Sequence, residues 1–206
     1  MKTRGIITAA LALAIGVFPL TAQTTSKKAV RGLKDAFTGE TTASAKYAAY
    51  AKKAREEDHP QIAVLFEAAS KAEGIHAANH KAALEQVGEK APAVDPKFDV
   101  KSTKENLEDA IKGESYEAST MYPGFIKDAN KEKVTIALIS FNYAMQTEKK
   151  HKILCEHALQ SLIEKKTALL ASQYQVCPTC GNTYDNTGPA RCGICMTSKD
   201  RYITIS

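Results

Sequence analysis

The chain has 206 residues, of which 44% are hydrophobic and 25% are charged. This is the composition of an ordinary globular protein with room for one sizeable core and one small appendage, so general disorder is excluded. The net charge of +5 falls to +3 without Lys2 and Arg4, and the other basic residues alternate with acidic ones. This weak, mixed charge argues against nucleic acid as a partner.

Residues 1–22 have the layout of a secretory signal peptide. A basic start precedes an acid-free apolar run from Ile6 to Leu20, and small residues end at Ala22. An uncleaved membrane anchor is the alternative, although the run is short for a span and contains Pro19. We therefore expect cleavage after Ala22 and export, to the periplasm, of a mature protein without a membrane span.

Residues 30–170 are dominated by Ala, Leu, Glu and Lys and contain few Gly and Pro, which is typical of helices. A long, proline-containing linker in the middle suits a crossover between two helical hairpins. The sequence predicts an all-α four-helix bundle, with helices over 29–57, 60–87, 103–130 and 132–171.

Each predicted helix carries an apolar stripe at alternating steps of three and four residues, and each stripe contains a carboxylate. Burying one unpaired carboxylate costs several kcal/mol, and no Lys or Arg lies in the stripes to offset it. Two divalent metal ions would offset this cost, because Glu-x-x-His places both side chains on one helix face, where they can bind one ion. The candidate ligands are Glu40, Glu73, His76, Glu114, Glu148 and His151.

These candidates form two copies of one unit. Glu40 precedes Glu114 by 74 residues, and the Glu-x-x-His pair of the second helix recurs 75 residues later in the fourth. One Glu from each of two helices and Glu-x-x-His from the other two is the pattern of ferritin-like di-iron and di-manganese proteins. Solvated carboxylates and packed histidines are the alternative, but they would require all these matches to coincide. Oxygen-rich ligation favours iron or manganese over zinc.

Five further residues near the stripes need an interpretation. Glu117 has Ala43 as its counterpart in the first hairpin, so it is a seventh ligand candidate and makes the site asymmetric. Pro123 removes a helical hydrogen bond and predicts a local kink. We expect Cys155 to be a small buried thiol. His80 and His157 are expected to pack around the site or support its ligands.

After Tyr174 the composition changes abruptly, and two Cys-x-x-Cys pairs follow with eleven residues between them. Such paired motifs make a tetrathiolate site for zinc or iron, with glycines supplying tight turns around sulfur. Two disulfides are the alternative in an oxidising compartment. The cysteines are Cys177, Cys180, Cys192 and Cys195.

From about residue 30 to the C-terminus the chain resembles the rubrerythrin family. The resemblance rests on "FTGE", "EGIH", "GESYE", "EKKH" and the cysteine pairs. It implies a ferritin-like di-iron bundle over 29–171 and a rubredoxin-like domain over 174–206. It also implies that Glu117 exchanges with His76 at one iron, and that Tyr47 and Tyr122 line the site, so these tyrosines and Glu117 become the catalytic candidates. The implied bundle ligands are Glu40, Glu73, His76, Glu114, Glu117, Glu148 and His151.

The resemblance implies an oxidoreductase, a peroxidase that reduces hydrogen peroxide to water in oxidative-stress defence. Electrons would come from an unidentified donor through iron at the cysteine site. The resemblance also implies a homodimer, in which electrons cross between the subunits. The second cysteine motif, "CGICM", departs from the family pattern and leaves iron versus zinc open. A ferroxidase or iron-binding protein with a structural zinc ribbon is the alternative, and an interaction module without turnover is a third.

Overall fold

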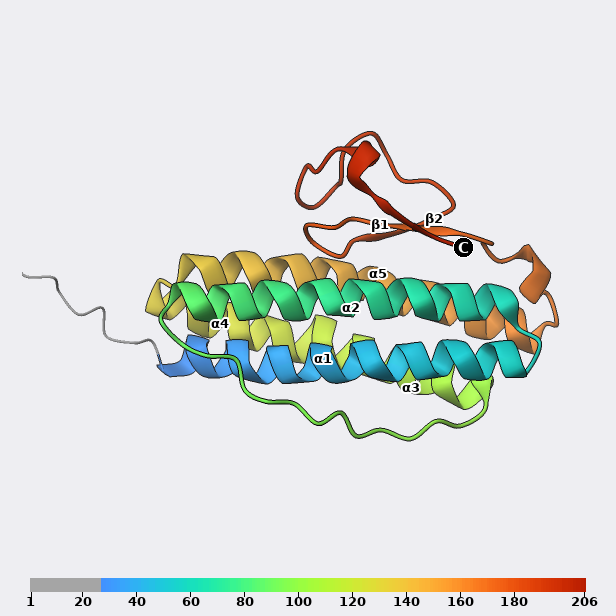
Figure 1. Cartoon of the computed structure of the whole chain (residues 1–206), viewed down its shortest axis with the longest axis horizontal. Helices are drawn as coiled ribbons and strands as arrows, with labels where there is room; N and C mark the ends of the chain where they lie inside the picture. Colours follow the sequence, from blue (N-terminus) through green and yellow to red (C-terminus); the bar gives the residue numbers. More distant parts are fainter. Residues whose placement is uncertain (1–26) are drawn as a thin grey trace, which may run out of the picture.

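The computed structural model describes residues 27–206, which form a helical bundle and a small sheet-bearing domain (Figure 1). This architecture confirms the predicted fold class. The bundle contains α1 (Lys27–Glu56), α2 (Pro60–Gln86), α3 (Thr103–Tyr116), the π-helical turn η1 (Glu117–Met121), α4 (Tyr122–Glu132) and α5 (Thr135–Ile163).

Local signals explain where these helices begin and end. The chain leaves α1 through Asp58 in the left-handed region, with φ of 60°, and Pro60 then opens α2, where its missing N–H costs nothing. The start of α3 is a capping box: the Ser102 hydroxyl accepts from the Glu105 amide, and the Glu105 carboxylate accepts from the Ser102 amide.

Residues 87–102 follow α1 along the length of the bundle, from the end of α2 to the start of α3 (Figure 1). This crossover makes α2 and α3 run in the same direction. Helix α1 packs against α2, while α3 and α4 pack against α5, and α2 also contacts α5. The arrangement is the two-hairpin bundle that the internal repeat predicts.

The third predicted helix, 103–130, is interrupted at η1. The Tyr122 amide bonds the Glu117 carbonyl, five residues back instead of four, and Pro123 has no amide to continue the α-helical ladder. A π-helical turn therefore replaces the simple kink that Pro123 predicts, and Glu117 lies at its first residue.

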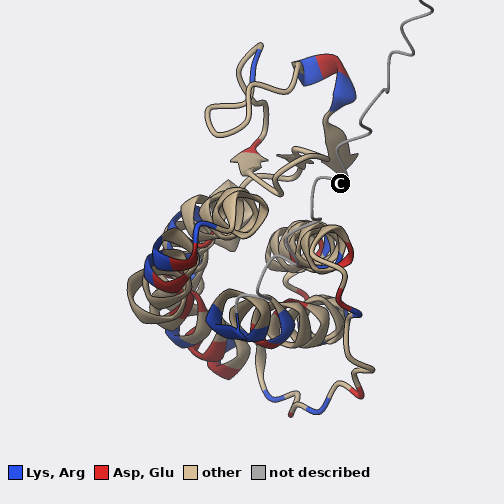
Figure 2. Ribbon diagram, turned by 90° about the vertical axis from the view of Figure 1, so that its left-hand side faces the viewer, with Lys and Arg blue, Asp and Glu red and all other residues tan. Residues whose placement is uncertain are grey.

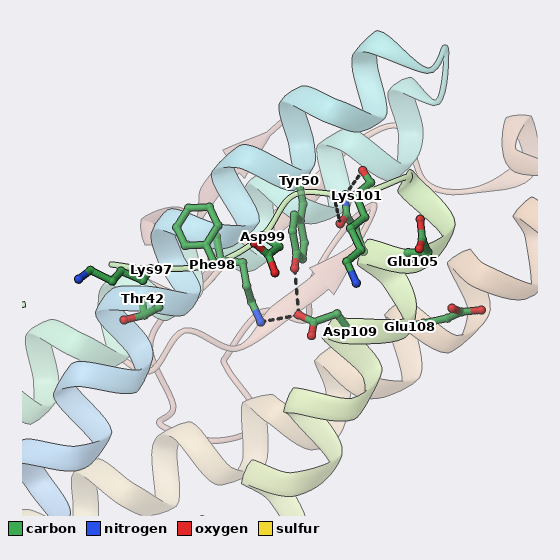
Figure 3. Close-up of a pocket in the computed structure, with 11 residues that line it drawn as sticks. Thr42, Tyr50, Lys97, Phe98, Asp99, Lys101, Glu105, Glu108 and Asp109 are labelled. Atoms are coloured by element: carbon green, nitrogen blue, oxygen red, sulfur yellow. Dashed lines mark hydrogen bonds and ion pairs between the residues drawn. The ribbon is translucent and has the colours of Figure 1, made fainter. Parts of the chain in front are cut away.

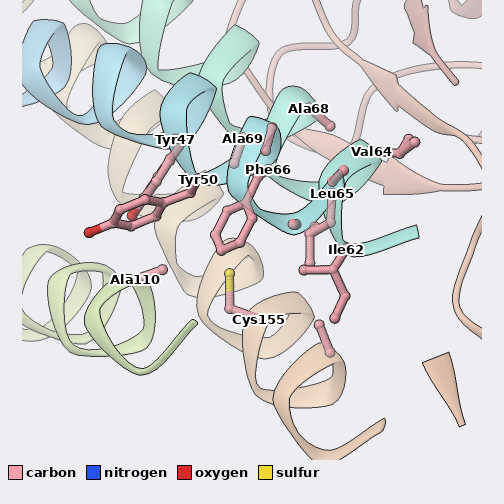
Figure 4. Close-up of a cluster of buried hydrophobic side chains, with 14 of the residues drawn as sticks. Tyr47, Tyr50, Ile62, Val64, Leu65, Phe66, Ala68, Ala69, Ala110 and Cys155 are labelled. Carbon is pink, nitrogen blue, oxygen red and sulfur yellow. The ribbon is translucent and has the colours of Figure 1, made fainter. Parts of the chain in front are cut away.

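Two apolar clusters fill the bundle, one toward each end. The first contains Tyr47, Phe66, Leu107 and Cys155, the last of which is a buried thiol as predicted (Figure 4). The second is built around residues such as Leu33 and Phe141. Along the sequence, each of the four buried carboxylates lies between residues of the two clusters, so the polar layer is enclosed by apolar packing on both sides.

The C-terminal domain contains a three-stranded antiparallel sheet, in which β1 (Tyr174–Val176) lies between β2 (Thr183–Asp185) and β3 (Ile203–Ile205). Helix α5 ends at Ile163, so the predicted end at residue 171 is wrong. The chain turns back through Lys165, with φ of 57°. Viewed along the bundle, the domain lies on one side of the helices (Figure 2). Two short helices complete this part of the chain: η2 (Thr167–Leu169) between α5 and β1, and η3 (Lys199–Arg201) before β3.

The predicted signal peptide, residues 1–22, lies outside the described residues. Between residues 27 and 206, none of the helices has the length and apolar character needed to cross a bilayer.

Candidate metal centre

Six buried side chains from four helices converge at the middle of the bundle. They form two groups of four whose ligand atoms lie within 4.8 Å of one another. Glu73 and Glu148 belong to both groups, so each can bridge two metal positions. The first group is completed by Glu40 and His76, and the second by Glu114 and His151.

The two histidines approach the bridging carboxylates in the same way. The Nδ1 atom of His76 lies 2.8 Å from Glu73 Oε2 and 2.9 Å from Glu148 Oε1. The Nδ1 atom of His151 lies 3.0 Å from the other oxygen of each carboxylate. The 75-residue sequence repeat therefore appears in space as a pseudo-symmetric pair of sites.

The hydrogen bonds on the far side of each ring fix the tautomers. His76 Nε2 donates to the Cys180 carbonyl at 3.1 Å, since a carbonyl can only accept. His151 Nε2 lies 3.0 Å from the Thr183 hydroxyl, whose own proton goes to the Gly181 carbonyl. Both Nε2 atoms therefore carry the proton, which leaves both Nδ1 lone pairs facing the carboxylates as metal ligands require.

These buried residues fit two metal ions. Among the described side chains, oxygens of all four carboxylates and His151 Nδ1 have no hydrogen-bond partner, although all are fully buried. Orphaned buried acceptors that point toward one another require a cation between them. Oxygen-rich ligation with two imidazoles suits iron.

The raised pKa values of several buried ligand candidates also indicate that the site lacks positive charge. Burial, reinforced by Glu73 and Glu148, raises the pKa of Glu40 well above its ordinary value. Burial alone would lower the pKa of His151, but Glu73 and Glu148 outweigh it and raise the value to about 10. In the same way, neighbouring carboxylates outweigh burial and raise the pKa of His76.

Each tyrosine predicted at the site donates to one terminal carboxylate. Tyr47 Oη bonds Glu114 Oε1 at 2.7 Å, and Tyr122 Oη bonds Glu40 Oε1. Glu117 belongs to neither group of four, and its side chain is half-buried. Its pKa is raised by burial of the carboxyl and then by Glu40 and Glu148, which shows that it lies within electrostatic reach of the cluster.

The four C-terminal cysteines form one cluster. The Sγ–Sγ distances are 3.4 Å for Cys177 and Cys195 and 3.5 Å for Cys180 and Cys192. Both exceed the disulfide bond length of about 2.05 Å, so the four cysteines are free, can hold one metal ion between them, and the disulfide alternative is wrong. A hydrogen bond from the Cys180 thiol, together with backbone amides, outweighs burial and lowers the pKa of Cys177 to about 4. The cluster fits an iron ion.

The first cysteine motif is docked directly on the bundle. Its Cys180 carbonyl accepts from His76, and the Thr147 hydroxyl shares its proton between this carbonyl at 3.2 Å and that of Tyr143 at 3.1 Å. Asn79 donates to the Thr179 carbonyl at 2.9 Å. Gly181 has φ of +79°, and a Cβ atom there would lie 2.4 Å from His76 Nε2. Only glycine permits this approach.

Several of these contacts were not predicted. The sequence interpretation missed Thr147 and Thr183, because nothing in their spacing relates them to a ligand. His80 is buried close to the site, whereas His157 is exposed, so the predicted packing or supporting role for His157 is wrong.

A surface pocket of about 460 Å³ between α1, α3 and the crossover is separate from this centre (Figure 3). Inside it, the Asp109 carboxylate accepts from Lys46 at 2.6 Å and from Tyr50 at 2.9 Å. These charges satisfy one another, and none of the buried ligand candidates lines the pocket.

Comparison with known proteins identifies the family. The Rubrerythrin family model matches residues 32–159. The chain is 35% identical to nigerythrin from Nitratidesulfovibrio vulgaris, covering 84% of each protein, and 32% identical to Rubrerythrin-2 from Clostridium acetobutylicum, covering 82% of this chain and 92% of the relative. A mixed-valence nigerythrin structure superposes with a TM-score of 0.77 at 30% identity, covering 99% of this chain and 100% of that one. The chain therefore belongs to the rubrerythrin family of ferritin-like di-iron oxidoreductases.

Proposed function

We propose that this protein is a di-iron peroxidase, which reduces hydrogen peroxide to water in oxidative-stress defence and receives its electrons through iron at the cysteine site. The observation that carries the proposal is the His76 imidazole. Its Nδ1 faces Glu73 and Glu148, and its Nε2 donates to the carbonyl of Cys180, one of the four sulfur ligand candidates. One ring thus joins the two centres.

The proposed ligands are those that the sequence predicts. Two ferrous ions in the bundle would supply together the two electrons that the O–O bond of hydrogen peroxide takes up on cleavage. A related nigerythrin structure is described as fully reduced and all ferrous, which supports iron here. The proposed ligands are Glu40, Glu73, His76, Glu114, Glu117, Glu148 and His151 in the bundle, and Cys177, Cys180, Cys192 and Cys195 in the C-terminal domain.

The remaining catalytic candidates hold the carboxylates and their charge. Tyr47 and Tyr122 each donate a hydrogen bond to an oxygen of one ligand carboxylate, which orients that carboxylate and disperses its charge. Glu117, beside the cluster at the start of the π-helical turn, is free of both groups of four and is available to replace His76. If Glu117 took the place of His76 at a metal ion, the bond from His76 Nε2 to the Cys180 carbonyl would still hold the ring.

The metal of the cysteine site tests the proposal against a ferroxidase with a structural zinc ribbon. Anaerobically purified protein should contain about three iron ions per chain, from the ligand counts, and the cysteine-bound iron should give a visible thiolate spectrum. When reduced protein is mixed with hydrogen peroxide, the bundle irons should be oxidised first and the cysteine-bound iron afterwards. Zinc at the cysteine site would exclude the electron route, because zinc has no redox chemistry.

Three predictions about partners and location remain proposals. Export rests on the sequence of residues 1–22 and is tested by N-terminal sequencing of the protein from fractionated cells. The homodimer rests on the family resemblance and is tested by light scattering of the purified holoprotein. The donor is unidentified, and the reduction rate of the cysteine-site iron by candidate redox proteins would identify it.

A further inference from the structure

Three consecutive hydrogen bonds connect α5 to the metal ligand Glu40. The Ser140 hydroxyl lies 2.7 Å from His80 Nδ1, and His80 Nε2 lies 3.0 Å from the Tyr122 hydroxyl. Tyr122 in turn donates to Glu40 Oε1. These residues come from four different helices, so the tertiary fold builds the chain of contacts.

The protons in these bonds have one direction. A metal-bound Glu40 is ionised and can only accept, so it takes the single hydroxyl proton of Tyr122. The Tyr122 oxygen must then accept from His80, which places the imidazole proton on Nε2. Burial lowers the pKa of His80 to about 3 and keeps its ring neutral. Nδ1 therefore accepts from Ser140, and every donor points toward Glu40.

The hydrogen-bonded residues nearest to Glu40 are closed to solvent. Glu40, His80 and Tyr122 are all 0% exposed, whereas Ser140 is 4% exposed and is the member nearest solvent. The rings of His80 and Tyr122 pack against Phe141, with centroids 5.6 and 6.1 Å apart. On the opposite side of the site, Tyr47 packs against the rings of Tyr50 and Phe66.

We propose that Ser140 and His80 are positioning residues that act through Tyr122 and form a path for protons from the surface of α5 to Glu40. The inference rests on the proposed function, because reduction of one hydrogen peroxide by two electrons consumes two protons and yields two waters. Tyr122 gives a proton to Glu40, which passes it to an oxygen released from the peroxide and is ionised again. Tyr122 takes its replacement from His80 Nε2, His80 takes one from Ser140 at Nδ1, and Ser140 takes one from the protons of the solvent. The path thus supplies one of the two protons, and each of the three groups ends neutral.

Ser140→Ala and Ser140→Thr form the matched pair that tests the path in the iron-loaded protein. Ser140→Ala removes the donor to His80 and should lower peroxide turnover about tenfold, with a larger solvent isotope effect in D2O. Ser140→Thr keeps the hydroxyl and should behave like the original protein. His80→Phe preserves a ring next to Phe141 but breaks the chain, and should lower turnover about 100-fold.

Two measurements separate this role from a merely structural one. All three variants should keep two metal ions in the bundle by metal analysis. In the zinc-loaded original protein, 15N NMR should find the proton of His80 on Nε2. A proton on Nδ1 would reverse the chain and overturn the inference, as would unchanged turnover and isotope effect in both Ser140→Ala and His80→Phe. If the original protein itself does not reduce peroxide, the proposed function fails instead.

Discussion

Met196 occupies a backbone conformation that favours glycine. Its φ is 63°, and it follows Cys195 just as Gly181, with φ of 79°, follows Cys180 in the first motif. The departure from the family pattern in "CGICM" is therefore a change of side chain at an unchanged turn. The 61% exposed methionine side chain meets solvent and not the core, so its cost is mainly that of the left-handed backbone.

Replacing this methionine by glycine should stabilise the C-terminal domain. Met196→Gly removes the left-handed penalty, and we expect a gain of about 0.5–1 kcal/mol in the free energy of unfolding. Thermal unfolding of the metal-loaded protein measures it. Met196→Ala is the control, because alanine keeps the backbone penalty and should change stability little. Equal stabilisation by both substitutions would mean that the side chain, and not the backbone, carries the strain.

Glu117→Ala should retain both bundle metals and slow peroxide turnover. Two groups of four ligands remain without Glu117, which belongs to neither. The substitution removes only the carboxylate available for exchange with His76. Metal analysis and peroxide kinetics measure the two effects separately. Glu73→Ala is the comparison, since Glu73 belongs to both groups and its loss should cost metal at both positions. Loss of both metals from Glu117→Ala would make Glu117 an ordinary structural ligand.

For single residues, the sequence predicts the ligands that recur in its internal repeat. It misses the residues whose role depends on one tertiary contact. Glu73 and His76 recur 75 residues later in the same helical register, so their convergence follows from the repeat. Ser140 and Thr183 reach the site only because separate segments meet there, and nothing in their local spacing shows it.

At the scale of helices and turns, two boundaries differ from prediction for physical reasons. Residues 164–171 have good helical propensity, but the chain must turn back after α5 to bring β1 against α2, and this packing overrides propensity. The third predicted helix has a continuous period, but the missing amide of Pro123 is accommodated by a π-helical turn. Periodicity could predict a helix there and could not predict the extra residue in its turn.

Gly181→Ala should separate the first cysteine motif from α2. The new Cβ would lie 2.4 Å from His76 Nε2 and 3.2 Å from the Ala72 carbonyl, so the loop must move away and the bond from His76 to Cys180 is lost. We expect both metal centres to be retained and electron transfer from the cysteine site to slow by at least about tenfold. Stopped-flow absorbance of the cysteine-bound iron after addition of peroxide measures that step.

Gly193→Ala is the matched control for this prediction. Gly193 is the residue after Cys192, as Pro178 is after Cys177, and a Cβ there meets nothing within 4 Å. It should transfer electrons at the original rate. Equal rates in Gly181→Ala and the original protein would show that the contact with His76 does not carry the electrons.

For the whole molecule, the main consequence of the fold is that one chain contains both centres and a direct contact between them. The family resemblance implies transfer between subunits of a dimer. Here His76 and Cys180 of the same chain are bonded, and His151 and Thr183 form a second bond across the same interface. The sequence predicts the two modules from a change in composition, but not this docking, which depends on Gly181 and on the turn after α5.

Mixing two defective variants would distinguish these routes. One variant carries Cys177→Ser and Cys180→Ser and lacks the cysteine-bound iron, and the other carries Glu73→Ala and Glu148→Ala and lacks the bundle irons. Transfer within one chain predicts that the refolded mixture gains no turnover over its separate components. Recovery of a substantial fraction of the original turnover would support transfer between subunits and would refute the route within one chain.

Removing the C-terminal domain should leave a single peroxide reduction intact and abolish repeated turnover. A chain that ends at Ala171 keeps every bundle ligand candidate and loses the hydrogen bonds of His76 and His151 to Cys180 and Thr183, which water can replace. After chemical reduction it should consume about one peroxide per chain rapidly. It should then show no further turnover when it is given an electron donor that works through the cysteine site.

The full-length protein with zinc at the cysteine site is the control. It distinguishes loss of the domain that covers the bundle site from loss of electron transfer through that domain. It keeps the domain docked over both histidines, but zinc cannot pass electrons. Both proteins should therefore perform the single reduction and fail to turn over, which assigns the loss to electron supply and not to exposure of the bundle site. If the zinc form turns over as fast as the iron form with the same donor, electrons enter the bundle by another path, and the C-terminal domain serves only to cover the site.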